Sequence, residues 1–190
     1  MPAIRPTAFL VTGFARAGKD TLAEAISEAS GAKRLAYADE LKDAANLLFE
    51  RFGLHGKVDC RREGDKIRHR ELLVAMGRAL RSEDRDVFAL PVARSAQYNL
   101  TAARSVVVSD WRYLNELGCM QEKLGPRPIV TIRISRFGLN AANQEEQDSI
   151  DLLNKQVQYT WAKMFKEGDI AGIREWAAEI VAAQPALHAF

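Results

Sequence analysis

The sequence has little cysteine and histidine, and neither residue is arranged for metal binding or for disulfides. Its two cysteines, Cys60 and Cys119, lie far apart and form no CxxC pair. The three histidines, His55, His69 and His188, are scattered, so no spacing typical of zinc ligands occurs. We therefore expect two reduced thiols in a reducing compartment, without a zinc site or a disulfide framework.

Long apolar runs and a strong net charge are also absent. No window approaches 18 apolar residues, which excludes a membrane-spanning helix. The N-terminal segment 1–6 lacks the apolar core of a signal peptide. The net charge of +2 gives no electrostatic reason to expect binding to nucleic acid or to an acidic membrane. We expect a cytoplasmic protein with neither a membrane nor a nucleic acid as partner.

The chain of 190 residues is the right length for one domain with a single sizeable core. Five apolar or alternating segments are predicted as strands, at 7–12, 33–38, 105–109, 128–134 and 158–164. Helical spacing predicts helices at 19–30, 39–52, 65–80, 86–98, 115–124 and 170–183, the second of them capped by Asp39. The polar stretch 135–148 has no apolar period and is predicted to be an exposed flap. Alternating strands and helices indicate an α/β fold with a mostly parallel sheet covered on both faces.

A glycine-rich segment, GFARAGKDT at 13–21, joins the first predicted strand to the first predicted helix. Such a turn presents backbone N–H groups in a concave nest, and the helix dipole adds partial positive charge. Lys19 is placed to reach the outer phosphates of a nucleoside triphosphate, although the strict motif has Ser or Thr where Asp20 stands. The predicted phosphate-binding residues are Gly13, Arg16, Ala17, Gly18, Lys19, Asp20 and Thr21.

A second group of polar residues follows the strand predicted at 105–109. Asp110 ends this β-branched strand, at the position where a carboxylate commonly lies near Mg²⁺. Arg112 would emerge at the carboxyl edge of the sheet, where α/β proteins bind ligands. The alternative is that Asp110 only caps the following helix. We favour a functional role because the phosphate loop ends at the same edge.

Further arginines are candidates for neutralising phosphate charge. Arg133 and Arg136 flank the start of the polar stretch 135–148, from which they would close on a transferring phosphoryl group. Arg70, in a basic stretch at 66–70, could reach an acceptor phosphate. Arg61 and Arg62 could do so instead, and periodicity does not choose among the three.

Four segments in order carry motifs that occur together in one family. They read GFARAGKDT at 13–21, YADELK at 37–42, RELL followed by MG at 70–77, and SDWR followed by NE at 109–116. These segments resemble the GxxxxGKDT, FADxLK, RxxLQxxG and SDxRxxNE motifs of nucleoside monophosphate kinases, most closely the phage-type deoxynucleoside monophosphate kinases. The resemblance runs over roughly two thirds of the chain, from about 8 to 136.

The resemblance implies a three-layer P-loop kinase fold in a single domain, 1–190. Its five-stranded parallel sheet would have the order 2-3-1-4-5. A helical monophosphate-binding insert would cover about 39–100 and a short lid about 135–148. The implied reaction transfers the γ-phosphoryl group of ATP to a (deoxy)nucleoside 5′-monophosphate with the aid of Mg²⁺, giving ADP and a (d)NDP. Members of the family are often dimeric.

The resemblance also implies roles for individual residues. Lys19 and its loop would hold the ATP phosphates, and Asp110 would help to hold Mg²⁺ through water. The residues expected at the acceptor monophosphate are Asp39, Lys42, Arg70, Asp110 and Arg112, and those of the lid are Arg133 and Arg136. Two alternatives stay open. One is a kinase acting on another acceptor, such as a modified base in phage DNA or a small alcohol, and the other is a nucleotide-binding module without turnover.

Overall fold

The core of the protein is one parallel sheet, seen in a computed structural model that describes residues 5–54 and 56–185. His55, His188 and the first residues of the N-terminal segment lie outside this described part. The strands are β1 (Ala8–Thr12), β2 (Lys33–Leu35), β3 (Val106–Val108), β4 (Ile129–Arg136) and β5 (Trp161–Phe165). Their order is β2-β3-β1-β4-β5 and every neighbouring pair is parallel, which confirms the predicted sheet.

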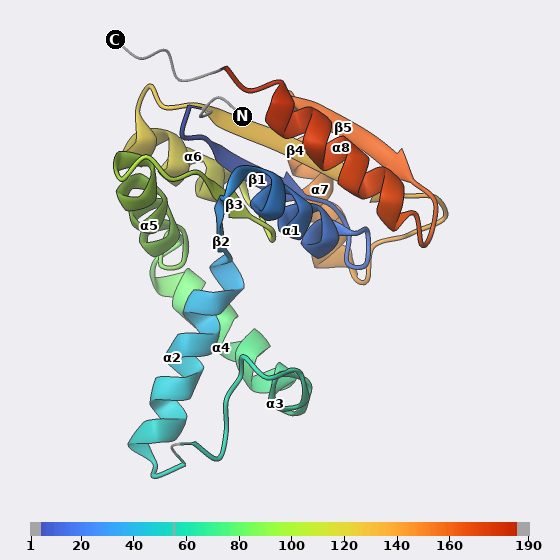
Figure 1. Cartoon of the computed structure of the whole chain (residues 1–190). Coiled ribbons are helices and arrows are strands. Elements are labelled where there is room, and N and C mark those ends of the chain that lie inside the picture. The colour runs from blue at the N-terminus through green and yellow to red at the C-terminus, as the bar shows by residue number, and fades with distance from the viewer. Residues whose placement is uncertain (1–4, 55, 186–190) are drawn as a thin grey trace.

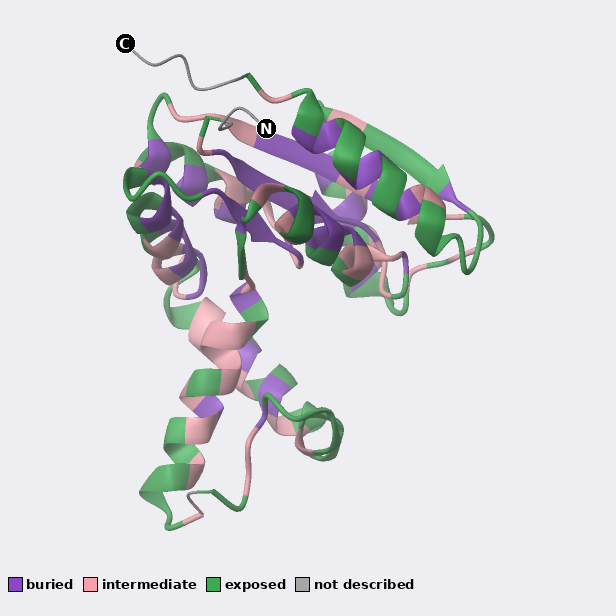
Figure 2. Cartoon of the chain, in the orientation of Figure 1, coloured by how far each residue is buried: buried purple, intermediate pink, exposed green. Residues whose placement is uncertain are grey.

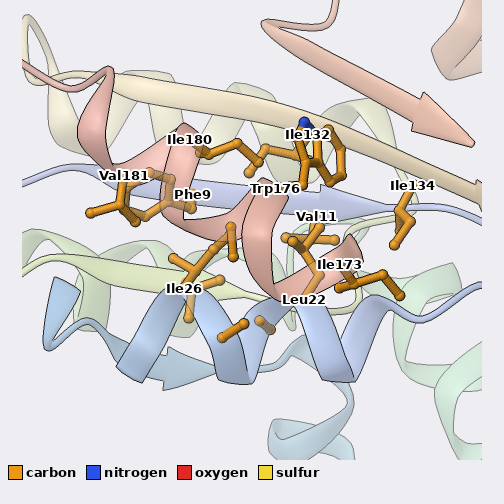
Figure 3. Close-up of a cluster of buried hydrophobic side chains, with 14 of the residues drawn as sticks. Phe9, Val11, Leu22, Ile26, Ile132, Ile134, Ile173, Trp176, Ile180 and Val181 are labelled. Carbon is orange, nitrogen blue, oxygen red and sulfur yellow. The ribbon is translucent and has the colours of Figure 1, made fainter. Parts of the chain in front are cut away.

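Helices cover both faces of the sheet (Figure 1). On one face lie α1 (Lys19–Ser30) and α8 (Ile170–Ala182), and on the other α5 (Ala89–Thr101), α6 (Leu114–Leu124) and α7 (Gln144–Gln156). Phe9 and Val11 of β1 pack toward α1 and α8, where Trp176 is buried among them (Figure 3). Ala8 and Leu10 point to the opposite core. Successive side chains of a strand point to opposite faces, so a strand buried on both sides is apolar throughout.

A helical insert extends away from the sheet between β2 and α5 (Figure 1). It consists of α2 (Tyr37–Arg51), α3 (Glu63–Arg68) and α4 (Arg70–Glu83). Its small separate core contains Ala45, Cys60 and Leu73, and most of its surface is exposed or half-buried (Figure 2). Because α2 follows β2 almost directly, the insert starts at the carboxyl end of the strands, where α/β proteins bind ligands.

The start of α2 differs from the prediction. The helix begins at Tyr37, two residues before the predicted cap, and Asp39 lies within its first turn. The free N–H groups of Tyr37 and Ala38 are bound by Asp110 from the end of β3. The side chain that caps α2 is therefore Asp110, 72 residues after Ala38, and the predicted cap Asp39 is wrong.

Two other predicted elements are wrong in extent. The helix predicted at 65–80 is two helices, because the chain turns at His69, whose ring packs 4.8 Å from that of Phe49. The stretch 135–148 is not one exposed flap, since β4 continues to Arg136 and α7 begins at Gln144. The buried apolar residues of α7, Ile150 and Leu153, come after this stretch, so it shows no helical period of its own.

None of the helices in the described part is long and apolar enough to span a membrane.

Candidate active site

The phosphate loop joins β1 to α1 in a strained but ordered turn. Arg16 and Gly18 have φ values of 66° and 98°, and the N–H of Ala17 donates to the carbonyl of Phe14 at 3.1 Å. Alternating right- and left-handed residues direct successive N–H groups to one side and form an anion-binding nest. The N-terminus of α1 begins at Lys19, where its dipole also favours an anion. This is the geometry that the motif predicts.

The Lys19 ammonium is held at the loop by the main chain. Its Nζ donates to the carbonyls of Gly13 and Phe14, each at 2.8 Å. Burial and, to a smaller extent, Arg112 lower the pKa of Lys19. The Asp20 side chain points away from the nest, since it is 86% exposed and pairs with Arg34 at 3.3 Å. Asp20 can therefore serve a phosphate only through its backbone N–H.

Asp110 connects the end of β3 to the insert. Its two oxygens accept the N–H groups of Tyr37 and Ala38 at 2.9 and 2.8 Å. Burial raises the pKa of Asp110, and these two hydrogen bonds oppose the rise. The alternative that Asp110 caps the following helix is wrong, because the helix it caps is α2.

Arg112 is fixed at both ends by glutamates. Its backbone N–H donates to Glu116 at 2.8 Å, and its Nη2 lies 3.3 Å from an oxygen of Glu146. Glu116 also accepts the N–H of Tyr113 at 3.0 Å, which completes a capping box at the start of α6. The guanidinium itself is half-exposed and faces the cavity between the sheet and the insert.

This cavity has a volume of about 490 Å³ and lies between α2, α4 and the connection from β3 to α6. Its lining includes six basic side chains, Lys42, Lys66, Arg70, Arg78, Arg81 and Arg112, and four acidic ones, Glu63, Asp110, Glu116 and Glu145. Arg61 and Arg62 do not line it, because they pair with Asp43 and Asp59 at 2.7 and 3.6 Å. Among the three arginines that the sequence could not separate, Arg70 is therefore the one that faces the cavity.

Two arginines of α4 mark opposite ends of the cavity. The Arg81 guanidinium lies 5.0 Å from the centroid of the Phe88 ring and 5.2 Å from that of Tyr113. Arg70 precedes it by three helical turns, which corresponds to about 16 Å along the axis. Among the described residues neither arginine has a carboxylate within ion-pair distance. Arg81 thus marks the end at the connection from β3 to α6, and Arg70 marks the outer end beside α3. Lys42, also on the lining, pairs with Asp39 at 2.7 Å.

A second cavity, of about 100 Å³, lies on the other side of the phosphate loop. Its lining includes Gly18, which caps α1, and Thr21 of the same helix. The turn between β5 and α8 and the side chain of Arg136 also line it. Arg136 also pairs with Glu167 of that turn at 2.9 Å. The predicted pair of lid arginines does not come together. Arg133 lies within β4, lines neither cavity and interacts with Tyr159 on the opposite face from Ile134.

Within residues 5–54 and 56–185, no group of three or more His, Cys, Asp or Glu residues could hold a metal ion. Mg²⁺ usually keeps several waters and binds one or two carboxylates together with substrate phosphates. Each Asp110 oxygen accepts one hydrogen bond and retains a lone pair, and the residue lines the larger cavity. Asp110 therefore fits a Mg²⁺ ion that it would hold through water.

The sequence alone indicates no role for several residues of the site. Arg81 lies on the same face of α4 as Arg70, eleven residues later, and this spacing was a usable signal. Glu116 belongs to the SDxRxxNE motif, but the local pattern does not indicate that this residue is buried. Glu145 and Glu146, which contact Arg78 and Arg112 from the first turn of α7, gave no signal in the sequence.

Glu116 gives the protein a pH-dependent stability. Burial raises the pKa of its carboxyl from 4.5 to about 8, so at neutral pH it is protonated in the folded state and ionised in the unfolded chain. The folded-state pKa is the higher one, so the contribution of Glu116 to stability is greatest below about pH 4.5 and falls as the pH rises toward about 8. Glu116→Gln keeps an accepting oxygen and cannot ionise. We expect its stability relative to the wild type to rise over this range, by on the order of 4 kcal/mol, in urea unfolding.

The matched control is Glu122→Gln, on the same helix, whose carboxyl is exposed and pairs with Lys123. This variant should differ from the wild type by less than about 0.5 kcal/mol at every pH. A difference between Glu116→Gln and the wild type that does not change from about pH 5 to about pH 8 would show that the pKa of Glu116 is not raised.

Comparison with protein-family models and with curated proteins finds no match. Solved structures do match. A dephospho-CoA kinase from Campylobacter jejuni aligns with a TM-score of 0.52 and 15% identity over 93% of this chain and 96% of its own. A sugar kinase from Janibacter sp. HTCC2649 aligns with a TM-score of 0.50 and 12% identity over 94% of each chain. The chain therefore has the fold of the P-loop kinases. At this identity, the likeness extends to the fold alone.

Proposed function

We propose that this protein transfers the γ-phosphoryl group of ATP to a (deoxy)nucleoside 5′-monophosphate, forming ADP and a (d)NDP. The observation that carries the proposal is the arginine-rich cavity of about 490 Å³ beside the phosphate loop. Its volume suits a ligand of nucleotide size. A monophosphate brings nearly two negative charges to the site, whereas a hydroxyl acceptor brings none. Arg112, Arg81 and Arg70 would offset this charge, with Lys42 and Asp39 beside the acceptor.

The mechanism needs little covalent help from the protein. The nest and Lys19 would hold the donor phosphates, and Arg112 would lie between donor and acceptor, where charge spreads over the transferring group. Mg²⁺, bound with ATP and held through water by Asp110, would neutralise further phosphate charge. An acceptor phosphate oxygen is already nucleophilic, so no general base is required. Positioning two phosphates in line then supplies most of the rate enhancement.

The smaller cavity is the place we propose for the base of the donor nucleotide. It adjoins the phosphate loop at Gly18 and Thr21, away from the arginine-rich cavity. The planar guanidinium of Arg136 borders it and suits stacking on a base. The seven residues between β4 and α7, 137–143, would serve as a short lid over this side.

The test is a coupled ADP-release assay over the common ribo- and deoxyribonucleoside monophosphates, with γ-labelled ATP. We expect at least one monophosphate to be converted to its diphosphate far above the rate of ATP hydrolysis. Label in a polymer or in a non-nucleotide alcohol would replace the proposal by a kinase with another acceptor. ATP binding without transfer to any monophosphate would replace it by a nucleotide-binding module.

Arg81 should set the affinity for the acceptor. Arg81→Lys keeps the charge but loses the planar fork and the stacking between Phe88 and Tyr113. We expect KM for the monophosphate to rise about tenfold, equivalent to about 1.4 kcal/mol, with KM for ATP unchanged. Arg85→Lys, an exposed neighbour, is the control. If Arg70→Lys raised this KM and Arg81→Lys did not, the acceptor would be held at the outer end only.

A further inference from the structure

Glu146 is a buried carboxylate that joins three separate segments of the chain. It is 3% exposed and lies in the first turn of α7. One oxygen accepts the N–H of Ala15 in the phosphate loop at 2.9 Å and lies 3.3 Å from Arg112 Nη2. The other oxygen accepts the N–H of Ala142 at 2.8 Å. A carboxylate is costly to bury unless donors surround it, and here both oxygens have donors.

These contacts fix Arg112 without using up its capacity to bind an anion. Glu146 accepts a hydrogen bond from Nη2, and Glu116 accepts one from the backbone N–H of the same arginine. Among residues 5–54 and 56–185, the remaining guanidinium nitrogens of Arg112 have no hydrogen-bond or ion-pair partner. The side chain is 41% exposed on the cavity side, so these nitrogens are available to a ligand.

Glu146 is poorly placed to be an anion mimic that ATP displaces. Its backbone N–H is bound by the Asn143 side chain at 2.9 Å, and Ser149 and Ile150 of the same helix are buried. The helix that carries Glu146 is therefore anchored, and a carboxylate that rotated away would lose the N–H groups of Ala15 and Ala142 and the Arg112 guanidinium. The contact thus ties the phosphate loop to the arginine at the acceptor cavity.

We propose that Glu146 is a positioning residue for phosphoryl transfer, which holds the Arg112 guanidinium at a fixed place beside the phosphate loop. This inference rests on the proposed function. Its physical basis is that a long arginine side chain loses rotamer entropy when it is fixed. With Glu146 in place, this cost is met before the substrates bind, and the arginine is aligned when charge develops on the transferring group.

The first arm of the test uses kinetics. Glu146→Gln keeps the size of the side chain and removes the charge that holds Arg112. We expect kcat to fall about tenfold or more, while KM for ATP changes less than about threefold. Glu28→Gln, which breaks the exposed pair with Arg174, is the matched control and should change neither. A loss of activity in Glu146→Gln that only follows its unfolded fraction would overturn the proposal.

The second arm uses chemical rescue, which a purely structural role of Glu146 would not affect. In Arg112→Ala the Glu146 carboxylate stays in place and should bind added guanidinium, which restores part of the activity. In the double variant Arg112→Ala/Glu146→Gln this rescue should be lost. Equal rescue in both variants would show that Glu146 does not position the guanidinium.

A third arm is independent of catalysis. In spectra of ¹⁵N-labelled arginine side chains, the Arg112 signal, assigned by its absence in Arg112→Ala, should show hindered rotation in the wild type and free rotation in Glu146→Gln. An unchanged signal overturns the proposal. If the wild type transfers phosphate to no monophosphate, the proposed function fails, while this arm still decides whether Glu146 holds Arg112.

Discussion

Lys19→Ala is expected to reduce phosphoryl transfer by about 100- to 1,000-fold while the fold is kept. Lys19 lies at the junction of the phosphate loop and α1, and its ammonium donates to two carbonyls of the same loop at 2.8 Å. In the complex it would reach the outer phosphates of ATP, where negative charge is concentrated. Loss of the side chain leaves these phosphates with the backbone N–H groups alone. ATP affinity should fall as well, because the cation also acts in the ground state.

The variant should remain folded, since Lys19 belongs to neither hydrophobic core. Two loop carbonyls lose a donor, which costs about 1–2 kcal/mol if water replaces it only in part. Circular dichroism and urea unfolding measure this loss, and initial rates of ADP release measure the activity. Lys155→Ala, at an exposed position of α7, is the control. Transfer by Lys19→Ala at a near wild-type rate would remove the loop from the mechanism.

The sequence was most informative where local residues alone determine an element. The bounds of α1, Lys19 and Ser30, were predicted without error because Gly18 and Gly31, both with positive φ, flank it. The strand order followed from the resemblance to a family, and the structure confirms it. The start of α2 was missed for the opposite reason, since its free N–H groups are bound by Asp110 from another strand.

The candidate site divides in the same way. The phosphate loop and the Asp110–Arg112 segment could be found because each occupies a short stretch after an apolar strand. The contact between Glu146 and Ala15 spans 131 residues and leaves no local pattern. The two rings that contact Arg81 come from different segments. Phe88 is the N-cap of α5, and Tyr113 is the N-cap of α6. Contacts of this kind depend on how the elements pack, which periodicity does not encode.

Gly13→Ala should have the largest effect on stability among single substitutions in the phosphate loop. Gly13 follows β1 directly and has a φ of 150°. A Cβ at this position would lie 2.1 Å from the carbonyl oxygen of Ile134 in the neighbouring strand β4. This is main chain, which cannot rotate away as a side chain would, so the two central strands must separate or the loop must shift. Overpacking and backbone strain together should cost about 3 kcal/mol.

Gly31→Ala separates the two causes. Gly31 has a φ of 69°, but an added Cβ would meet no atom within 4 Å. Only the backbone strain of about 1–2 kcal/mol then applies. Thermal unfolding should place Gly13→Ala several degrees below Gly31→Ala, since 1 kcal/mol corresponds to about 2–4 °C at this chain length. ATP binding should be lost in Gly13→Ala and kept in Gly31→Ala. If Gly13→Ala were as stable as its control yet failed to bind ATP, Gly13 would serve the phosphates directly and the approach of β4 would not be the reason for glycine.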